Sequence, residues 1–133
     1  MEHGVKEPMR VEQFSTSCLE FTGPDGENLA ICETDTASLP PAVGHIPSLL
    51  AIRGFHSAQL CVDKSSDIGT LLTFMGFVAD PRDGDTQRFQ LPSFSTASII
   101  DVPYIENGEA AQESAGSVHH IAFAVKDDAL NLG

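Results

Sequence analysis

The sequence predicts an α+β fold built around one β-α-β-β-β unit, and three observations lead to this prediction. Two similar strand-like stretches, residues 54–63 and 117–128, lie at a fixed separation that aligns Val62 with Val125, which suggests a repeated supersecondary unit. After the first stretch, apolar residues follow at the spacing of one helix face. Three short strand-like runs come next, separated by turns that contain Gly or Pro.

The length of the chain allows one domain with a hydrophobic core, and its charge restricts its partners. The chain has 133 residues, of which 7 are Lys or Arg and 19 are Asp or Glu, for a formal net charge of −12. This charge repels nucleic acids and anionic membrane surfaces. No stretch approaches the roughly 20 apolar residues of a membrane span. The N-terminus has no secretory apolar region, so we expect a cytoplasmic protein.

The three cysteines give no sign of a metal site or a disulfide framework. Cys18, Cys32 and Cys61 are odd in number and far apart, and no CxxC or zinc-finger spacing occurs. We therefore predict that all three are reduced thiols, as is usual in the cytosol.

The first third of the chain is predicted to contain one hairpin between two irregular segments. Residues 1–16 are polar without a clear period and are expected to form a flexible start. Residues 17–33 hold two short apolar runs on either side of Gly-Pro-Asp-Gly, a strong turn signal, and are predicted to form a hairpin. Residues 34–51 contain three prolines and are predicted to be a Pro-rich linker.

Residues 52–104 are predicted to form the complete unit. The apolar residues of its helix lie at i, i+3, i+4 and i+7, on the face that we expect to pack on the sheet: Ile68, Leu71, Leu72 and Met75. Ser65 or Ser66 can cap the start of this helix, and Gly76 suits the left-handed position at its end. The three strands that follow are predicted at residues 77–79, 86–91 and 97–104.

The last part of the chain is predicted to be a loop, residues 105–116, and the first strand of a following unit within residues 117–133. One face of that strand carries small side chains beside a histidine: Val118, His120, Ala122 and Ala124. These leave a hollow lined by an imidazole, which suits a metal and its ligand. The other face is bulky and is expected to pack on a core: His119, Ile121, Phe123 and Val125.

The first repeat stretch offers different residues at the positions that line the hollow, namely Ser57, Gln59 and Cys61. His56 falls on the packing side of this stretch, together with Ala58, Leu60 and Val62. We therefore interpret His56 as structural and His120 as the candidate metal ligand. For two adjacent histidines on a strand, a satisfied core histidine or a partly exposed pair is the more frequent explanation, so that interpretation also stays open.

Three strings of residues resemble a known family. Ile-Arg-Gly-Phe-His-Ser at 52–57, Gly-Ser-Val-His-His-Ile-Ala-Phe at 116–123 and Val-Lys-Asp-Asp at 125–128 resemble the vicinal oxygen chelate superfamily, which comprises the glyoxalase, bleomycin-resistance and dioxygenase proteins. Within it they are most similar to the ring-cleaving dioxygenase branch that includes hydroquinone dioxygenases. The resemblance runs from about residue 17 to the end and implies βαβββ modules of the glyoxalase/bleomycin resistance/dioxygenase type.

The resemblance also implies a cofactor and a division of the chain. Members of this branch hold Fe(II) with two histidines and one glutamate, and His120 stands at the position of one histidine. The elements that supply the other two ligands have no counterpart here. Where the last strand of a module offers a carboxylate, this chain has Ala30 and Asp101, which makes Asp101 a weak second candidate. The hairpin at 17–33 then ends a preceding module, 52–104 is complete, and 117–133 begins the next one.

Three functions are compatible with these expectations. The first is an extradiol-type dioxygenase, an oxidoreductase that uses Fe(II) and O₂ on a catechol- or hydroquinone-like substrate, present as a partial chain that lacks a complete metal site; Mn(II), or no metal in this chain, are the alternatives. The second is a metal-free small-molecule binding or resistance module, and the third is a glyoxalase-like metal lyase or isomerase. Because partial modules leave open strand edges, we also expect a homodimer formed by module or strand exchange.

Overall fold

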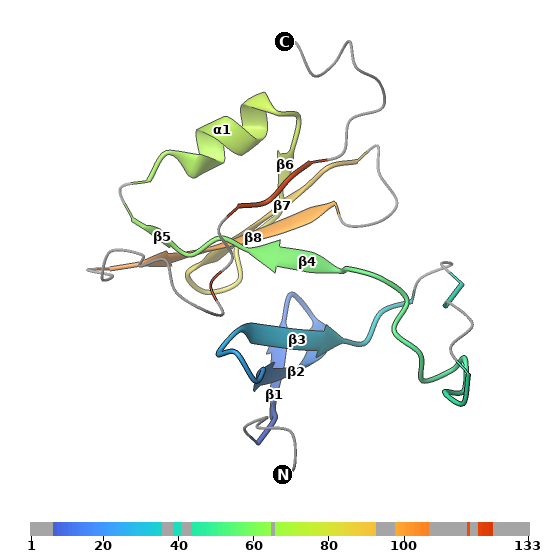
Figure 1. Cartoon of the computed structure of the whole chain (residues 1–133). Coiled ribbons are helices and arrows are strands. Elements are labelled where there is room, and N and C mark those ends of the chain that lie inside the picture. The colour runs from blue at the N-terminus through green and yellow to red at the C-terminus, as the bar shows by residue number, and fades with distance from the viewer. Residues whose placement is uncertain are drawn as a thin grey trace.

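Among the residues that it describes, the computed structural model of the chain contains two β-sheets and one short helix (Figure 1). The structure describes residues 7–35, 39–40, 44–64, 66–92, 98–106, 117 and 120–123. No helix in these ranges is long and apolar enough to cross a membrane. Residues 107–116 of the predicted loop, together with His119, Ala124 and everything after it, lie outside the described residues.

The first sheet is an antiparallel meander of β1 (Met9–Gln13), β2 (Thr16–Thr22) and β3 (Asn28–Cys32). The predicted hairpin at 17–33 is confirmed, since β2 and β3 pair across a turn in which Gly26 has a φ of 90°. The prediction of a flexible start through residue 16 is wrong for residues 9–16, because β1 completes the sheet beside β2. The alternation of apolar and polar residues in this short strand is too weak to predict a strand from the sequence.

A disulfide joins Cys18 of β2 to Cys32 of β3, so the prediction of reduced thiols is wrong for these two residues. The two cysteines are directly opposite each other in the strand register, with their Cα atoms 4.1 Å apart. The two cysteines are 14 residues apart in the sequence, and only the pairing of β2 with β3 brings them together. Cys61, the third cysteine, is a free and exposed thiol.

The second sheet contains the predicted order of one strand, one helix and three further strands. Its first strand is interrupted, giving β4 (Ser57–Gln59) and β5 (Val62–Asp63), both parallel to β8. The helix α1 (Ile68–Phe74) precedes the strands β6 (Val78–Ala79), β7 (Thr86–Gln90) and β8 (Ile99–Ile105). The strand order is β4-β8-β7-β6, with β8 in the interior of the sheet.

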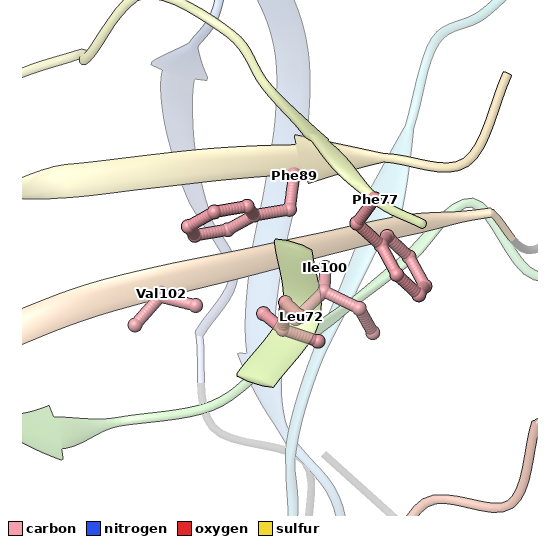
Figure 2. Packing of buried hydrophobic residues seen from close by; sticks show 5 residues of the cluster. All are labelled: Leu72, Phe77, Phe89, Ile100 and Val102. Carbon is pink, nitrogen blue, oxygen red and sulfur yellow. The ribbon is translucent and has the colours of Figure 1, made fainter. Parts of the chain in front are cut away.

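The core lies between α1 and one face of the second sheet (Figure 2). It consists of five buried apolar residues: Leu72, Phe77, Phe89, Ile100 and Val102. Leu72 is buried and Ile68 packs against this cluster, as predicted. Leu71 and Met75 are 52% and 40% exposed, so the prediction that they pack on the sheet is wrong. The helix is only two turns long, and its contact face is too narrow for four residues.

The ends of α1 largely follow the sequence signals. The hydroxyl of Ser66 accepts a hydrogen bond from the amide of Ile68 at 3.4 Å, although Asp67 occupies the N-cap position itself. Gly76 has a φ of 97°, the left-handed conformation predicted for the end of the helix.

The segment that contains His120 lies beside this core, but its described residues are not in a strand. Residues 120–123 carry no strand pairing, which contradicts the predicted strand for this part of it. A strand needs a hydrogen-bonded neighbour, and none of the strand pairings in the described residues includes residues 120–123. The predicted packing side is nevertheless confirmed for Ile121, which packs against the core, and for Phe123, whose ring lies 5.6 Å from that of Phe77.

Candidate functional site

The face of the second sheet opposite α1 is polar, and part of it is buried. Successive residues of a strand point to opposite faces, so Arg88 and Asp101 point away from the core residues Phe89 and Ile100. Arg88 is 7% exposed and Asp101 is 1% exposed. Thr86 on the same face is also buried. This buried polar layer is the most distinctive chemical feature of the described residues.

Arg88 and Asp101 form a buried ion pair across β7 and β8. The Nε and Nη2 atoms of Arg88 each donate a hydrogen bond of 2.8 Å, one to Oδ1 and one to Oδ2 of Asp101. This two-point geometry matches the planar guanidinium to the planar carboxylate. Both carboxylate oxygens of Asp101 are therefore engaged by a cation of the protein itself.

The turn between β1 and β2 covers this ion pair. The guanidinium carbon of Arg88 lies 4.1 Å from the centroid of the Phe14 ring, a cation–π contact. Phe14 and Ser15 have φ values of 49° and 58°, left-handed conformations that non-glycine residues rarely adopt. The backbone amide of Phe14 donates a hydrogen bond of 2.7 Å to Oδ2 of Asp83. Tertiary contacts thus hold a locally unfavourable turn against the sheet.

Two glutamines extend the contact between the sheets. The Gln59 amide donates to Oε1 of Gln13 at 3.3 Å, and the Gln13 amide donates to the hydroxyl of Thr86 at 3.5 Å. The contacts that tie the hairpin tip to the second sheet are therefore mostly polar. Sequence reasoning missed the tip because Phe14-Ser15 lacks the Asn, Asp or Gly that usually marks a two-residue turn.

A cleft of about 610 Å³ opens beside the tip. Its lining is dominated by charged residues, with one aromatic ring: Glu12, Phe14, Ser15, Asp80, Pro81, Arg82, Asp83, Arg88 and Gln90. Two of the three carboxylates already accept hydrogen bonds, Asp80 from Gln90 at 2.7 Å and Asp83 from Phe14. The lining therefore combines three carboxylates with two guanidinium groups, so the cleft is of mixed charge rather than apolar.

His56 lies on the polar side of the sheet, so the prediction that it packs on the helix side is wrong. Its Nδ1 atom is 2.9 Å from the hydroxyl oxygen of Ser57. Burial lowers the pKa of His56, the positive charge of Arg88 lowers it further, and the negative charge of Asp101 acts in the opposite direction. Strand alternation does not apply to His56, because β4 begins only at Ser57.

The other residues predicted to line a hollow have different environments. Ser57 and Gln59 alternate with Ala58 and occur on the polar face of the second sheet. Cys61 is exposed at the break between β4 and β5. Ala122 is exposed, and Ala124 lies outside the described residues.

The residues present do not fit a complete metal site. His120 is exposed, and Asp101 is bound by Arg88. Within the part of the chain that the structure describes, no group of three or more His, Cys, Asp or Glu side chains could hold a metal ion. A two-histidine, one-carboxylate iron site requires three converging ligands, and this set of residues does not provide them.

Comparison with known proteins relates the chain to ring-cleaving dioxygenases. It is 31% identical over 95% of its length to "Chlorohydroquinone/hydroquinone 1,2-dioxygenase" of Sphingobium indicum. It is 30% identical over 90% of its length to "Putative ring-cleaving dioxygenase MhqO" of Bacillus subtilis. The chain covers 42% and 38% of these two proteins, so it spans about two fifths of their length. No protein-family model matches it.

A solved structure agrees with these relatives. The "putative dioxygenase from Bacillus subtilis" superposes on 95% of this chain with a TM-score of 0.85 and 29% identity, and the match covers 41% of that protein. The chain is therefore related, in sequence and in fold, to enzymes of the dioxygenase family.

Proposed function

We propose that this chain is part of a ring-cleaving dioxygenase that uses O₂ to open a catechol- or hydroquinone-like aromatic ring. The observation that carries the proposal is similarity over nearly the whole chain to two proteins named for this activity, together with a TM-score of 0.85 to a dioxygenase structure. At about 30% identity the chain shares the fold of these relatives, and we expect the protein to catalyse the class of reaction for which they are named.

Within such an enzyme the described residues other than His120 serve as framework rather than as the metal centre. The buried Arg88–Asp101 pair and the hairpin tip fix two sheets against each other. Fe(II) is the metal we propose for the whole enzyme, where it would bring substrate oxygens and O₂ together. His120 is the one ligand candidate that we retain. Since no group of three converging ligands occurs among the described residues, we infer that the isolated chain does not turn over substrate.

The two alternative functions have less support from the same geometry. A metal-free module that sequesters an aromatic compound needs an apolar or aromatic lining, and the described cleft has one aromatic ring among charged residues. A glyoxalase-like enzyme needs two carboxylate ligands, and Asp101 is already paired with Arg88.

A chimera tests the proposed function directly. The segment of the Sphingobium enzyme that matches this chain is replaced by these residues, and hydroquinone-dependent O₂ uptake is measured together with bound iron. We expect an iron-containing chimera that consumes O₂ with hydroquinone. Replacement of His120 by Ala in the chimera is expected to lower the bound iron.

Two controls make the result interpretable. The isolated chain, supplied with Fe(II) and either hydroquinone or catechol, is expected to show no O₂ uptake above buffer. A folded chimera that retains iron but is inactive toward both compounds would show that the chain comes from a protein with a different reaction.

A further inference from the structure

Cys18 and Cys32 meet at the end of the β2–β3 hairpin that lies away from its turn. The antiparallel register places the two cysteines directly opposite each other. The adjacent residue pair is hydrogen-bonded, because the amide of Glu33 donates to the carbonyl oxygen of Ser17 at 2.9 Å. Cys18 and Cys32 are therefore a non-hydrogen-bonded pair, the kind in which opposite side chains approach most closely. The backbone pairing alone thus brings the two sulfur atoms together.

The first sheet is held by backbone pairing that does not require a bond between these sulfur atoms. The register joins β1 to β2 through five residue pairs and β2 to β3 through another five. At the turn, the amide of Gly23 donates to the carbonyl oxygen of Glu27 at 2.8 Å, which closes the hairpin at its other end. Both the dithiol and the disulfide form are therefore compatible with the same sheet.

The cysteine pair is within reach of a small thiol reagent. Cys18 and Cys32 are half-buried rather than buried. The strand β3 is an edge strand of the first sheet (Figure 1). The ends of edge strands open more readily than central strands. Cys61 is also accessible, but the other two cysteines of the chain are joined to each other, so Cys61 remains a free thiol.

We propose that Cys18 and Cys32 form a reversible redox switch that pins the exit of β3 to β2, with a small disulfide such as oxidised glutathione as the oxidant. The thiolate of one cysteine attacks a sulfur atom of oxidised glutathione, breaks its S–S bond and releases one reduced glutathione. The thiolate of the other cysteine then attacks the mixed disulfide, which forms the protein disulfide and releases the second reduced glutathione. The two cysteines lose two electrons and two protons, which the two glutathione thiols gain.

The switch acts at the point where the chain leaves the first sheet. Cys32 is the last residue of β3, and the Glu33 amide bonds to Ser17 one position beyond it. In the disulfide form this end of the hairpin cannot open, because a covalent bond joins the two strands. In the dithiol form the end can fray, which exposes the Glu33 amide to solvent. Oxidation therefore fixes the place from which the connection to β4 starts.

A redox titration of the whole 133-residue chain with reduced and oxidised glutathione tests the proposal. Cys61→Ser is the background, so that only the pair reacts; thiols are counted by alkylation, and the intact mass is measured. We expect a reversible transition to a form lighter by about 2 Da, with the same midpoint from either direction. In this background, Cys32→Ser is the matched control and should instead gain one glutathione at Cys18.

Amide hydrogen exchange measured on the two forms tests the structural effect. We expect the Glu33 amide to exchange about tenfold or more slowly in the disulfide form, whereas the Gly23 amide at the turn should change less than about twofold. Circular dichroism confirms that both forms are folded.

Three results overturn the proposal. A disulfide that persists in a large excess of reduced glutathione is a fixed structural bond. Free thiols or glutathione adducts at every glutathione ratio show that the two sulfur atoms do not meet in solution. Equal exchange of the Glu33 amide in both forms shows that the bond forms without acting on the exit of β3.

Discussion

Replacing Asp101 with Asn should destabilise the fold strongly, because it leaves the buried guanidinium of Arg88 without a counter-ion. The side chain keeps its shape, but the change removes both the negative charge and one of the two hydrogen-bond acceptors. Both members are nearly inaccessible to water, and two hydrogen bonds of 2.8 Å join them. Breaking a buried pair of this kind costs about 3–5 kcal/mol. That loss is about a fifth or more of the stability of a typical domain, which is about 5–15 kcal/mol.

The measurement is urea unfolding, followed by circular dichroism, together with a thermal melt. For a chain of this length, we expect the midpoint of thermal unfolding to fall by about 10–20 °C. The exposed pair between Lys64 and Glu106 is the matched control, at 2.6 Å. Glu106→Gln should change stability by less than about 1 kcal/mol, since exposed pairs contribute little.

A double variant distinguishes loss of charge pairing from loss of packing. Arg88→Met combined with Asp101→Leu removes both charges and should recover most of the stability lost by Asp101→Asn, because apolar replacements of similar volume satisfy the same site. If Asp101→Asn lowers stability by less than about 1 kcal/mol, the pair is not buried in solution and the reasoning about the polar face fails.

Four further outcomes are expected from the same structure. Leu72→Asp buries an unpaired charge in the core and should leave no cooperative unfolding transition; an unchanged melting temperature would contradict the core assignment. Because burial lowers the pKa of His56, the folded state disfavours protonation of this side chain, and the free energy of unfolding should fall as the pH drops below the ordinary value of 6.5. His56→Gln should weaken this dependence of stability on pH, measured by urea unfolding from pH 8 to 5. Cys18→Ser removes the disulfide to Cys32 and should therefore lower the free energy of unfolding by about 3 kcal/mol under non-reducing conditions. Unfolding in the presence of a thiol reductant, which opens the disulfide of the unmodified protein as well, should show no difference between the two proteins. Ser15→Gly should raise stability by about 1 kcal/mol in the same assay, because glycine tolerates a φ of 58°.

The second sheet was predictable because its signals are local. The spacing of Ile68 and Leu72, the glycine at position 76 and the Pro- and Gly-containing turns each depend on neighbours in the sequence. The spacing of apolar residues identifies the apolar face of α1. It does not predict how much of that face is buried, because this depends on the sheet on which the helix packs.

The polar layer was not predictable, because it depends on contacts between distant segments. Phe14 and Arg88 belong to stretches that show no relation in the sequence, and Phe14 was assigned to a flexible start. Asp101 was predicted only as a weak second metal-ligand candidate. In the structure both of its carboxylate oxygens are bonded to Arg88 on the neighbouring strand. A cross-strand neighbour is known only once the register is known.

Among the described residues, the contacts between the two sheets are chiefly polar, and the apolar residues Leu19, Leu29 and Ile31 of the first sheet remain exposed. The tip of the first sheet contributes Gln13 and Phe14 to the contact, whereas Leu19 and Ile31 lie on strand positions that the contact does not use. Polar contacts orient the sheets but release little apolar surface from water, so this contact contributes little hydrophobic stabilisation to the first sheet.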